Sequence, residues 1–417
     1  MADVKPFKAI RPAHDKAEHI AALPYDVMNT AEAKAEIDRE PLSFLAIDRP
    51  ETNFPDGYDM YAPEVYDKAK EILDRMIAEG DFIEDDKSCY YIYELTMDGR
   101  SQTGIVAVCS ASDYENNIIK KHENTLAAKE QDRIRHISTL GAQTGPIFLA
   151  YRRESEIDDI VNKYKADKPV YDFTSPDDIT HRVWIISKDS DIEKISGSFK
   201  GIQEIYIADG HHRCASAVRV CNGGATGFDG AKMEALPEKD RYFMSVLFPD
   251  SELKIYDYNR VVRDLNGLSE SRFFDRLRKK YTVERLGSEI AKPGKKGEMT
   301  MYISGVWYRL TIKDEFVVND PVSSLDVAIL QNEVLSPILN IEDPKTDQRI
   351  SFVGGIRGLK ELVRLVDSGE YEVAFAMHPT SIDELFAVAD AGRLMPPKST
   401  WFEPKLRSGL FINRFRK

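Results

Sequence analysis

The sequence predicts an α+β protein with two domains, residues 1–262 and residues 263–417. Strand-like and helical stretches follow one another without regular β-α-β alternation, which is typical of α+β folds. The chain of 417 residues is longer than a single hydrophobic core usually organises. With 42% hydrophobic and 30% charged residues, the composition indicates a folded globular protein.

The first elements are a short strand, helices and a hairpin. KPFKAIRP reads as a strand that ends at Pro12, and the weak helix that follows is interrupted at Pro24. Asn29 or Thr30 can cap the next helix. Residues 61–80 place apolar side chains on one helical face, and residues 89–111 form two strands around an MDGR turn.

Two segments share the order strand, polar turn, helix. They are residues 115–141, which contain KHENT, and residues 204–220, which contain DGHHR. Further strands are predicted in GPIFLAY, HRVWIISKD, RYFMSVLFP and LKIYDYNRVV.

The second domain begins with a charged helix and a strand over residues 265–290. Apolar and polar side chains tend to alternate over residues 299–312, which predicts a hairpin. A helical segment, DVAILQNEVLSPIL, precedes a polar loop at 343–355 (DPKTDQRISFVGG). The strand YEVAFAMHP, the helix SIDELFAVADAG and a proline-bounded loop at 395–406 complete the pattern.

Composition also restricts the partners and the compartment. The 70 acidic residues outnumber the 57 Lys and Arg, and the net charge of −13 disfavours nucleic acid as a partner. The four cysteines show no CxxC spacing, which favours a reducing cytoplasm. Without an export signal or a long apolar run, we expect a cytoplasmic protein with no membrane partner.

DGHHR, residues 209–213, is the strongest candidate site. Gly210 permits a tight turn, the following helix directs N–H groups at an anion, and Arg213 can bind phosphate through two hydrogen bonds. His211 and His212 are further donors or acids. The alternatives are a helix cap made by Asp209 and, less favoured, a zinc site, for which the usual ligand spacings are absent. The chain contains neither a P-loop nor a strand-linked GxGxxG motif.

Two other motifs supply carboxylates. KHENT brings Lys121, His122 and Glu123 to a strand end, where a carboxylate can act as general base and a cation can bind phosphate. PYDV places Asp26 on a rigid turn. A solvated strand end and a turn aspartate are the structural alternatives.

Five residues of the second half are possible substrate or phosphate contacts. Lys398, Ser399 and Thr400 lie in the stiff MPPKST loop, where an exposed connector is an equal alternative. Asn259 and Arg260 follow a strand, where they are anion contacts or an ion-paired edge. Ser399 lacks the GxSxG or SxxK context of a hydrolase nucleophile.

The motifs of this chain together resemble those of domain-of-unknown-function family 1015. They occur in the family's order over residues 7 to about 412, and they are PYDV, KHENT followed by KEQDR, GPIF, IADGHHR, YNRVV and MPPKSTWFEPKLRSGL. That family is similar to the ParB/sulfiredoxin-like superfamily, which implies a mixed-sheet core with an additional C-terminal α+β region. It further implies that Gly210 to Arg213 hold nucleotide phosphates. His211 stands where sulfiredoxins have a cysteine, and the loop lacks the Glu-Arg-Arg of partitioning proteins, so the kinases of free serine are the branch with the greatest similarity.

The resemblance implies phosphoryl transfer from ADP or ATP, with Mg²⁺, to a small hydroxyl metabolite such as free L-serine. Asp26 is the first choice for the proton-accepting carboxylate and Glu123 the second, with His122 beside it in the catalytic set. A nucleotide-binding regulatory protein without catalysis and a metal-dependent hydrolase are the alternative functions.

Overall fold

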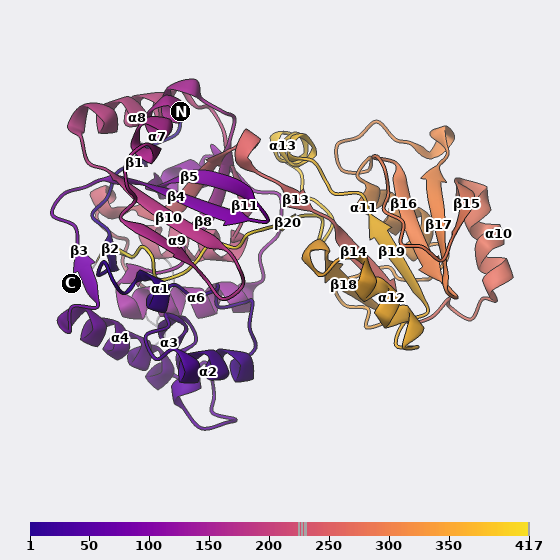
Figure 1. Cartoon of the computed structure of the whole chain (residues 1–417), viewed down its shortest axis with the longest axis horizontal. Helices are drawn as coiled ribbons and strands as arrows, with labels where there is room; N and C mark the ends of the chain where they lie inside the picture. Colours follow the sequence, from indigo (N-terminus) through magenta and orange to yellow (C-terminus); the bar gives the residue numbers. More distant parts are fainter. Residues whose placement is uncertain (224–225, 227, 229–231, 416–417) are drawn as a thin grey trace. The chain divides into compact units, whose positions relative to one another are not determined.

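The computed structural model describes residues 1–223, 226, 228 and 232–415 (Figure 1). They form two compact units. The first holds Met1–Leu253 and the C-terminal segment from Pro404, and the second holds Lys254–Glu403. The chain therefore enters the second unit before residue 262 and returns to the first near its end.

Strands and helices of the first unit alternate irregularly. The strands are β1 (Val4–Lys5), β2 (Ile10–Pro12), β3 (Phe82–Glu84), β4 (Tyr90–Met97), β5 (Arg100–Ser110), β6 (Ile119–Lys120), β7 (Ala142–Gln143), β8 (Ile147–Tyr151), β9 (Tyr171–Thr174), β10 (Thr180–Ile186), β11 (Ile205–Asp209), β12 (Tyr242–Pro249) and β21 (Asn413–Arg414). The helices are α1 (Ala17–Ile20), α2 (Thr30–Arg39), α3 (Leu45–Asp48), α4 (Pro63–Ala78), α5 (Ala111–Glu115), α6 (Ala127–Leu140), α7 (Ser155–Lys165), α8 (Asp189–Gly201) and α9 (His211–Asn222).

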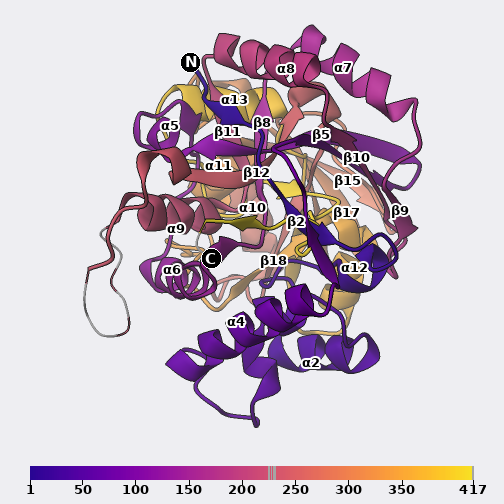
Figure 2. The same cartoon turned by 90° about the vertical axis from the view of Figure 1, so that its left-hand side faces the viewer.

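A mixed sheet of nine strands organises this unit, in the order β6-β11-β8-β12-β5-β4-β10-β9 with β1 on β5. The pairs β6–β11 and β8–β12 are parallel and the others are antiparallel. Figure 2 shows this unit from the side, with α6 beside α9 and α7 beside α8. The predicted α+β class is confirmed, and the ParB/sulfiredoxin-like assignment stays a prediction.

Local sequence accounts for several of these elements. Asn29 caps α2 through a reciprocal capping box with Glu32, which satisfies two N–H groups of the first turn. The apolar face of α4 is buried as its spacing predicts. Asp98 and Gly99 both have positive φ in the turn between β4 and β5, as an Asp-Gly hairpin turn requires.

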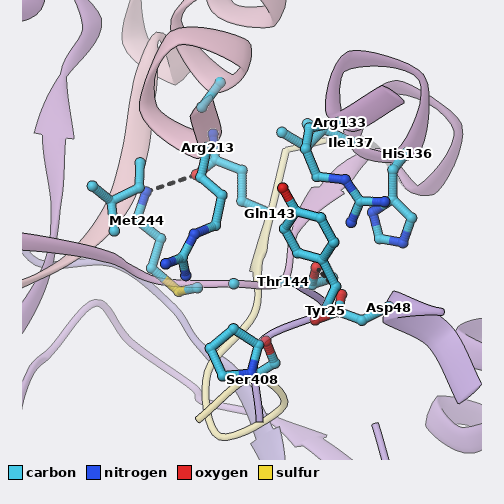
Figure 3. A pocket seen from close by; sticks show the side chains of 14 residues that line it. Tyr25, Asp48, Arg133, His136, Ile137, Gln143, Thr144, Arg213, Met244 and Ser408 are labelled. Atoms are coloured by element: carbon cyan, nitrogen blue, oxygen red, sulfur yellow. Dashed lines mark hydrogen bonds between the residues drawn. The ribbon is translucent and has the colours of Figure 1, made fainter. Parts of the chain in front are cut away.

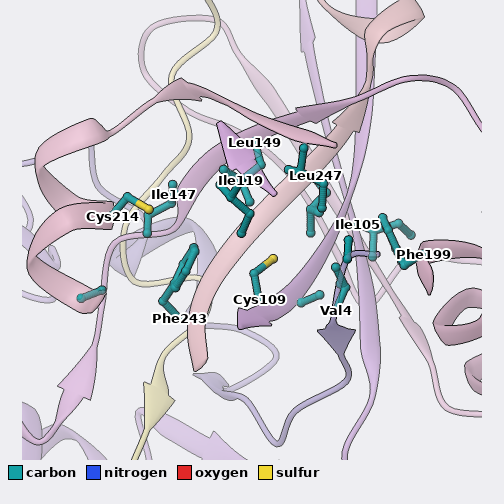
Figure 4. Close-up of a cluster of buried hydrophobic side chains, with 14 of the residues drawn as sticks. Val4, Ile105, Cys109, Ile119, Ile147, Leu149, Phe199, Cys214, Phe243 and Leu247 are labelled. Atoms are coloured by element: carbon teal, nitrogen blue, oxygen red, sulfur yellow. The ribbon is translucent and has the colours of Figure 1, made fainter. Parts of the chain in front are cut away.

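The core of the first unit lies between the central strands and the helices that cover them. Figure 4 shows part of it, including Ile105, Leu149, Leu247 and Cys109, each at most 1% exposed. Full burial of an aliphatic side chain of this size stabilises the fold by about 1.5–3 kcal/mol. This packing fixes the strand ends from which the candidate site is built.

The second unit is built on an antiparallel sheet of six strands, β15-β17-β16-β19-β14-β18. Its strands are β13 (Ile255–Tyr256), β14 (Tyr258–Val262), β15 (Tyr281–Gly287), β16 (Glu298–Ile303), β17 (Val306–Ile312), β18 (Ile350–Gly354), β19 (Val373–Met377) and β20 (Trp401–Phe402). Its helices are α10 (Glu270–Lys280), α11 (Asp326–Leu330), α12 (Leu359–Asp367) and α13 (Ile382–Asp390). The expectation of a polar loop throughout 343–355 was wrong, because β18 forms there by pairing with β14.

Candidate functional site

The DGHHR loop joins β11 to α9 through a left-handed residue. Gly210 has φ +90° and ψ 34°, a conformation that an L side chain rarely adopts. The first hydrogen bond of the helical ladder runs from the Cys214 N–H to the Gly210 carbonyl (2.9 Å). The N–H groups of residues 211–213 therefore precede the helical ladder and lie at the positive end of the helix dipole, the arrangement that binds anions in many proteins.

Asp209 is held by two cations. Its carboxylate lies 3.3 Å from Lys405 Nζ and 3.7 Å from Arg213 Nη2. Burial raises the pKa of Asp209, but Lys405 and Arg213 outweigh this effect and hold that pKa well below its usual range. The carboxylate is thus a partner for cations rather than a proton acceptor. Lys405 was not among the predicted site residues, because only the return of the C-terminal segment brings it here.

KHENT and DGHHR are brought together by the parallel pairing of β6 with β11. The imidazole rings of His122 and His211 meet edge to face, with centroids 4.5 Å apart. The backbone N–H of His122 donates to His211 Nε2 at 3.4 Å, and Glu123 lies 3.9 Å from His211 Nδ1. His212 Nε2 accepts a hydrogen bond from the Leu126 N–H at 3.0 Å. The two predicted motifs therefore lie in contact with each other.

Both rings of the His122–His211 pair are uncharged near neutral pH. His122 is 1% exposed, and burial lowers its pKa to about 4. Burial and the neighbouring His122 lower the pKa of His211 well below its usual range. Neither ring nitrogen of His122 makes a hydrogen bond in the described part of the chain, although the Ile207 carbonyl lies close to the ring. The pair can offer neutral N–H donors to a ligand but not positive charge.

PYDV reaches the same region through Tyr25. The Tyr25 side chain and Arg213 both line a cavity, and Asp26 is exposed in the adjoining turn. Burial raises the pKa of Tyr25, with Arg133 and Arg213 opposing the shift and Asp26 adding to it. Asp26 is therefore near the cavity but does not line it.

Figure 3 shows this cavity, which we call the Tyr25 cavity. It has an enclosed volume of about 30 Å³ and is lined by Pro24, Tyr25, Asp48, Arg133, His136, Ile137, Gln143, Thr144, Gly145, Ile147, Arg213, Ala217, Met244 and Ser408. The Arg133 guanidinium stacks on the Tyr25 ring at 3.9 Å from its centroid. Sequence reasoning missed Arg133 and Asp48 as site residues. The KEQDR motif that contains Arg133 was the available signal.

Hydrogen bonds fix the walls of the Tyr25 cavity. Gln143 Oε1 accepts from the Met244 N–H at 2.7 Å, and Arg213 Nη1 donates to the Pro146 carbonyl at 2.7 Å. Asp48 Oδ1 accepts from Thr144 Oγ1 at 3.0 Å. These side chains are thus held in place before any ligand binds.

The predicted contacts of the second half lie together in the second unit. Arg260 is buried and donates to the carbonyls of Tyr258 and Lys398. Asn259 donates to Asp257 Oδ2 at 2.6 Å and accepts from the Met377 N–H, and Ser399 Oγ donates to the Pro396 carbonyl at 2.6 Å. Arg260 thereby ties the MPPKST loop, including Thr400, to β14. A role of these residues in ligand binding stays a prediction, as does that of Lys121.

In residues 1–223, 226, 228 and 232–415, no group of three or more His, Cys, Asp and Glu side chains is arranged to hold a metal ion. Within the same ranges, no helix combines the length and the apolar character needed to cross a membrane.

The fold and the geometry define the class of protein: an α+β protein in which the loop between β11 and α9 adjoins a cavity lined by Arg133, Arg213 and Asp48. Residues 4–328 match the model of the family described as "Protein of unknown function (DUF1015)", and the chain belongs to that family. The comparison with curated proteins gave no match.

Several solved structures are similar at low identity. A free serine kinase in complex with AMP is 15% identical with a TM-score of 0.35, over 74% of this chain and 91% of that one. A conserved hypothetical protein from Pyrococcus furiosus is 15% identical with a TM-score of 0.35, over 74% and 95%. C-terminally truncated SbnI from Staphylococcus aureus is 11% identical with a TM-score of 0.39, over 74% and 87%.

Proposed function

We propose that this protein is a nucleotide-dependent phosphotransferase that acts on a small hydroxyl metabolite, with free L-serine as the first acceptor to test. The observation that carries the proposal is the joint site of DGHHR and KHENT. There the N-terminus of α9 places His211 beside Glu123, and Arg213 lines the cavity that PYDV also reaches. Phosphoryl transfer requires positioning and charge neutralisation of this kind.

In the proposed reaction the acceptor oxygen attacks the terminal phosphorus of ADP or ATP. A new P–O bond forms, the bond to the leaving AMP or ADP breaks, and the acceptor proton passes to a carboxylate. The N–H groups at the start of α9 and the Arg213 guanidinium would bind the phosphate oxygens. His211 would add a neutral hydrogen-bond contact, and His212 would lie close by, held by the Leu126 N–H.

Asp26 and Glu123 are the candidate proton acceptors. Asp26 is exposed on the turn next to Tyr25, while the Glu123 side chain is 35% exposed and lies near His211. Asp209 is the weaker candidate because two cations hold it ionised. The proposal therefore requires one of the first two residues to face the acceptor hydroxyl.

Mg²⁺ commonly binds through one or two carboxylates and the phosphates of a nucleotide, which is compatible with the donors here. Asp209 or Glu123 would supply the carboxylate oxygen. Bound in this way, the ion would neutralise charge on the phosphates.

The test is incubation of the purified chain with Mg²⁺, L-serine and ADP or ATP, followed by detection of O-phosphoserine and the released nucleotide. We expect product with one of the donors. Other small hydroxyl compounds should be included as acceptors. Absence of product with every donor and acceptor would refute the proposal, and saturable nucleotide binding without product would support the regulatory alternative instead.

Four variants assign the roles. Arg213→Ala should weaken nucleotide binding about tenfold or more, because hydrogen bonds to a charged group are worth about 1.5–3 kcal/mol, and Arg213→Lys should restore only part of it. Asp26→Asn and Glu123→Gln should leave nucleotide binding within about threefold, and only the variant that removes the base should lower kcat, by on the order of a hundredfold or more. Equal activity of both carboxylate variants and the wild type would exclude these two residues as the base.

A further inference from the structure

The Tyr25 cavity contains charged groups of both signs. Arg133 and Arg213 supply two guanidinium groups, and Asp48 supplies one carboxylate. Asp48 is 3% exposed, so its charge is removed from bulk water. Buried charges normally have a partner of opposite sign, since an unpaired ion in a protein interior costs several kcal/mol.

Asp48 makes no direct ion pair within the described ranges, although Arg133 lies close enough for a favourable charge interaction with it. Its one hydrogen bond within those ranges is from the neutral Thr144 hydroxyl, and no Lys, Arg or His nitrogen of the described chain lies within 4.0 Å of its oxygens. His136, which also lines the cavity, donates no charge, because burial and Arg133 lower the pKa of its imidazole. The Asp48 carboxylate therefore keeps acceptor capacity for a positively charged donor in the cavity.

The two arginines can bind an anionic group. Arg133 is paired with Asp132 on the same helix, at 2.8 Å, and directs its planar face at Tyr25. Arg213 donates to the Pro146 carbonyl, and its nearest carboxylate, Asp209, is at 3.7 Å and is shared with Lys405. The guanidinium groups on the cavity wall thus keep the capacity to bind an additional anionic group.

The size of the cavity restricts the ligand. Its enclosed volume of about 30 Å³ holds on the order of two water molecules, and with the open space at its mouth the empty volume is about 470 Å³. A compact charged head group fits the enclosed part, while a short substituent can extend toward the mouth. Larger ligands would have to displace buried side chains such as Ile137 or Met244.

We infer that the Tyr25 cavity binds the head group of a small α-amino acid, with the ammonium group at Asp48 and the carboxylate at the Arg133 and Arg213 guanidinium groups. The inference rests on the proposed function, because it makes this cavity the acceptor site of the phosphotransferase. It adds Asp48 and Arg133 as residues that determine specificity. A hydroxy acid without an amine would donate no charged hydrogen bond to Asp48, and an amine without a carboxylate would accept none from the arginines.

The experiment compares ligands that differ in one group, by isothermal titration in the absence of nucleotide and Mg²⁺. L-Alanine and L-lactate differ only by an ammonium in place of a hydroxyl, and isopropylamine lacks the carboxylate. We expect L-alanine and L-serine to bind about tenfold or more tightly than L-lactate and isopropylamine, as one charged hydrogen bond predicts. Equal affinity for L-alanine and L-lactate, or no binding of either amino acid, would overturn the inference.

Two variants test the assignment within the cavity. Asp48→Asn keeps the size of the side chain and an acceptor for Thr144. It should weaken the binding of L-alanine about tenfold or more and change the binding of L-lactate less than threefold. Gly145→Ala is the second variant, because its new methyl would meet Arg213 Cδ and Ser408 Oγ at 3.6 Å, an ordinary contact. It should fold normally and weaken L-serine binding severalfold by filling the cavity. Unchanged binding by both folded variants would contradict the location.

L-Alanine has no hydroxyl and accepts no phosphoryl group, so its binding is independent of turnover. Binding of amino acids without product formation would refute the phosphotransferase and leave the amino-acid site intact. Transfer to L-glycerate as efficient as transfer to L-serine would leave the phosphotransferase intact and overturn the amino-acid site.

Discussion

At the scale of single residues, the surroundings of Asp209, His122 and His211 determine their charge states. Asp209 faces Lys405 and Arg213, which keep its carboxylate ionised. His122 and His211 are buried against each other and are neutral near pH 7. Positive charge beside Asp209 therefore comes from Arg213 and Lys405, and not from the His122 and His211 rings.

Burial of His122 predicts a dependence of stability on pH. Its pKa falls from 6.5 to about 4, so between these pH values the unfolded chain binds more protons than the folded chain. The free energy of unfolding therefore falls as the pH falls through this window. The loss that is due to His122 is about 2 kcal/mol between pH 7 and pH 5. His122→Leu should therefore show a smaller fall in thermal midpoint between pH 7 and pH 5 than the wild type.

The control for this measurement is His14→Gln, because His14 is exposed and should not change the difference. The other buried histidines contribute to the wild-type slope and remain in both variants. A His122→Leu protein with the same pH dependence as the wild type would show that His122 is protonated in the folded state.

At the scale of elements, the site depends on how β11 turns into α9. Gly210 reverses the chain with φ +90°, and a Cβ atom there would come within 3.0 Å of Arg213 Nε. A substitution would therefore affect both the backbone and the side chain that is expected to bind phosphate.

Gly57→Ala separates these two effects. Gly57 has a similar φ of +84°, but its new methyl would meet no atom within 4 Å. Both Gly210→Ala and Gly57→Ala should lower the free energy of unfolding by about 1–2 kcal/mol, the cost of a left-handed alanine. Only Gly210→Ala should also weaken nucleotide binding, by severalfold or more in a titration. Loss of binding in Gly57→Ala would point to a general effect of destabilisation.

At the scale of the whole molecule, the C-terminal segment completes the first unit. After the second unit, the chain returns at Pro404, supplies Lys405 to Asp209 and pairs β21 with β7. Arg407 is 4% exposed and donates to Ser175 Oγ at 2.9 Å and to Asp177 and His181. This buried network joins the last residues to β9 and β10.

Arg407→Ala should destabilise the first unit by about 3–5 kcal/mol, because it leaves buried polar groups without their partner. Hydrogen exchange should increase in β9 and β10 and not in β16 and β17 of the second unit. The matched control is Arg393→Ala, which removes a half-exposed ion pair with Asp320 in the second unit and should cost at most about 1 kcal/mol. Equal effects of the two variants would refute a structural role of the C-terminal segment.

Much of this molecule was predictable from short-range patterns. The capping box at Asn29, the Asp-Gly turn at 98–99 and the strand-turn-helix order of KHENT and DGHHR each depend on neighbours within a few residues. β18 was missed because its strand exists only through pairing with β14. Lys405 and Arg133 were missed for a related reason, since their position in the site depends on contacts with residues far away in the sequence.

The sequence by itself determined the α+β class, the family and the residues of the DGHHR loop, because these follow from local composition, turn chemistry and motif order. The tertiary structure alone decided which loops meet. Parallel pairing of β6 with β11 placed KHENT against DGHHR, and α3, α6 and the PYDV turn enclosed Asp48, Arg133 and Tyr25 around Arg213. Such contacts arise from packing between elements distant in the sequence, so no local pattern encodes the place of Asp48 in the cavity wall.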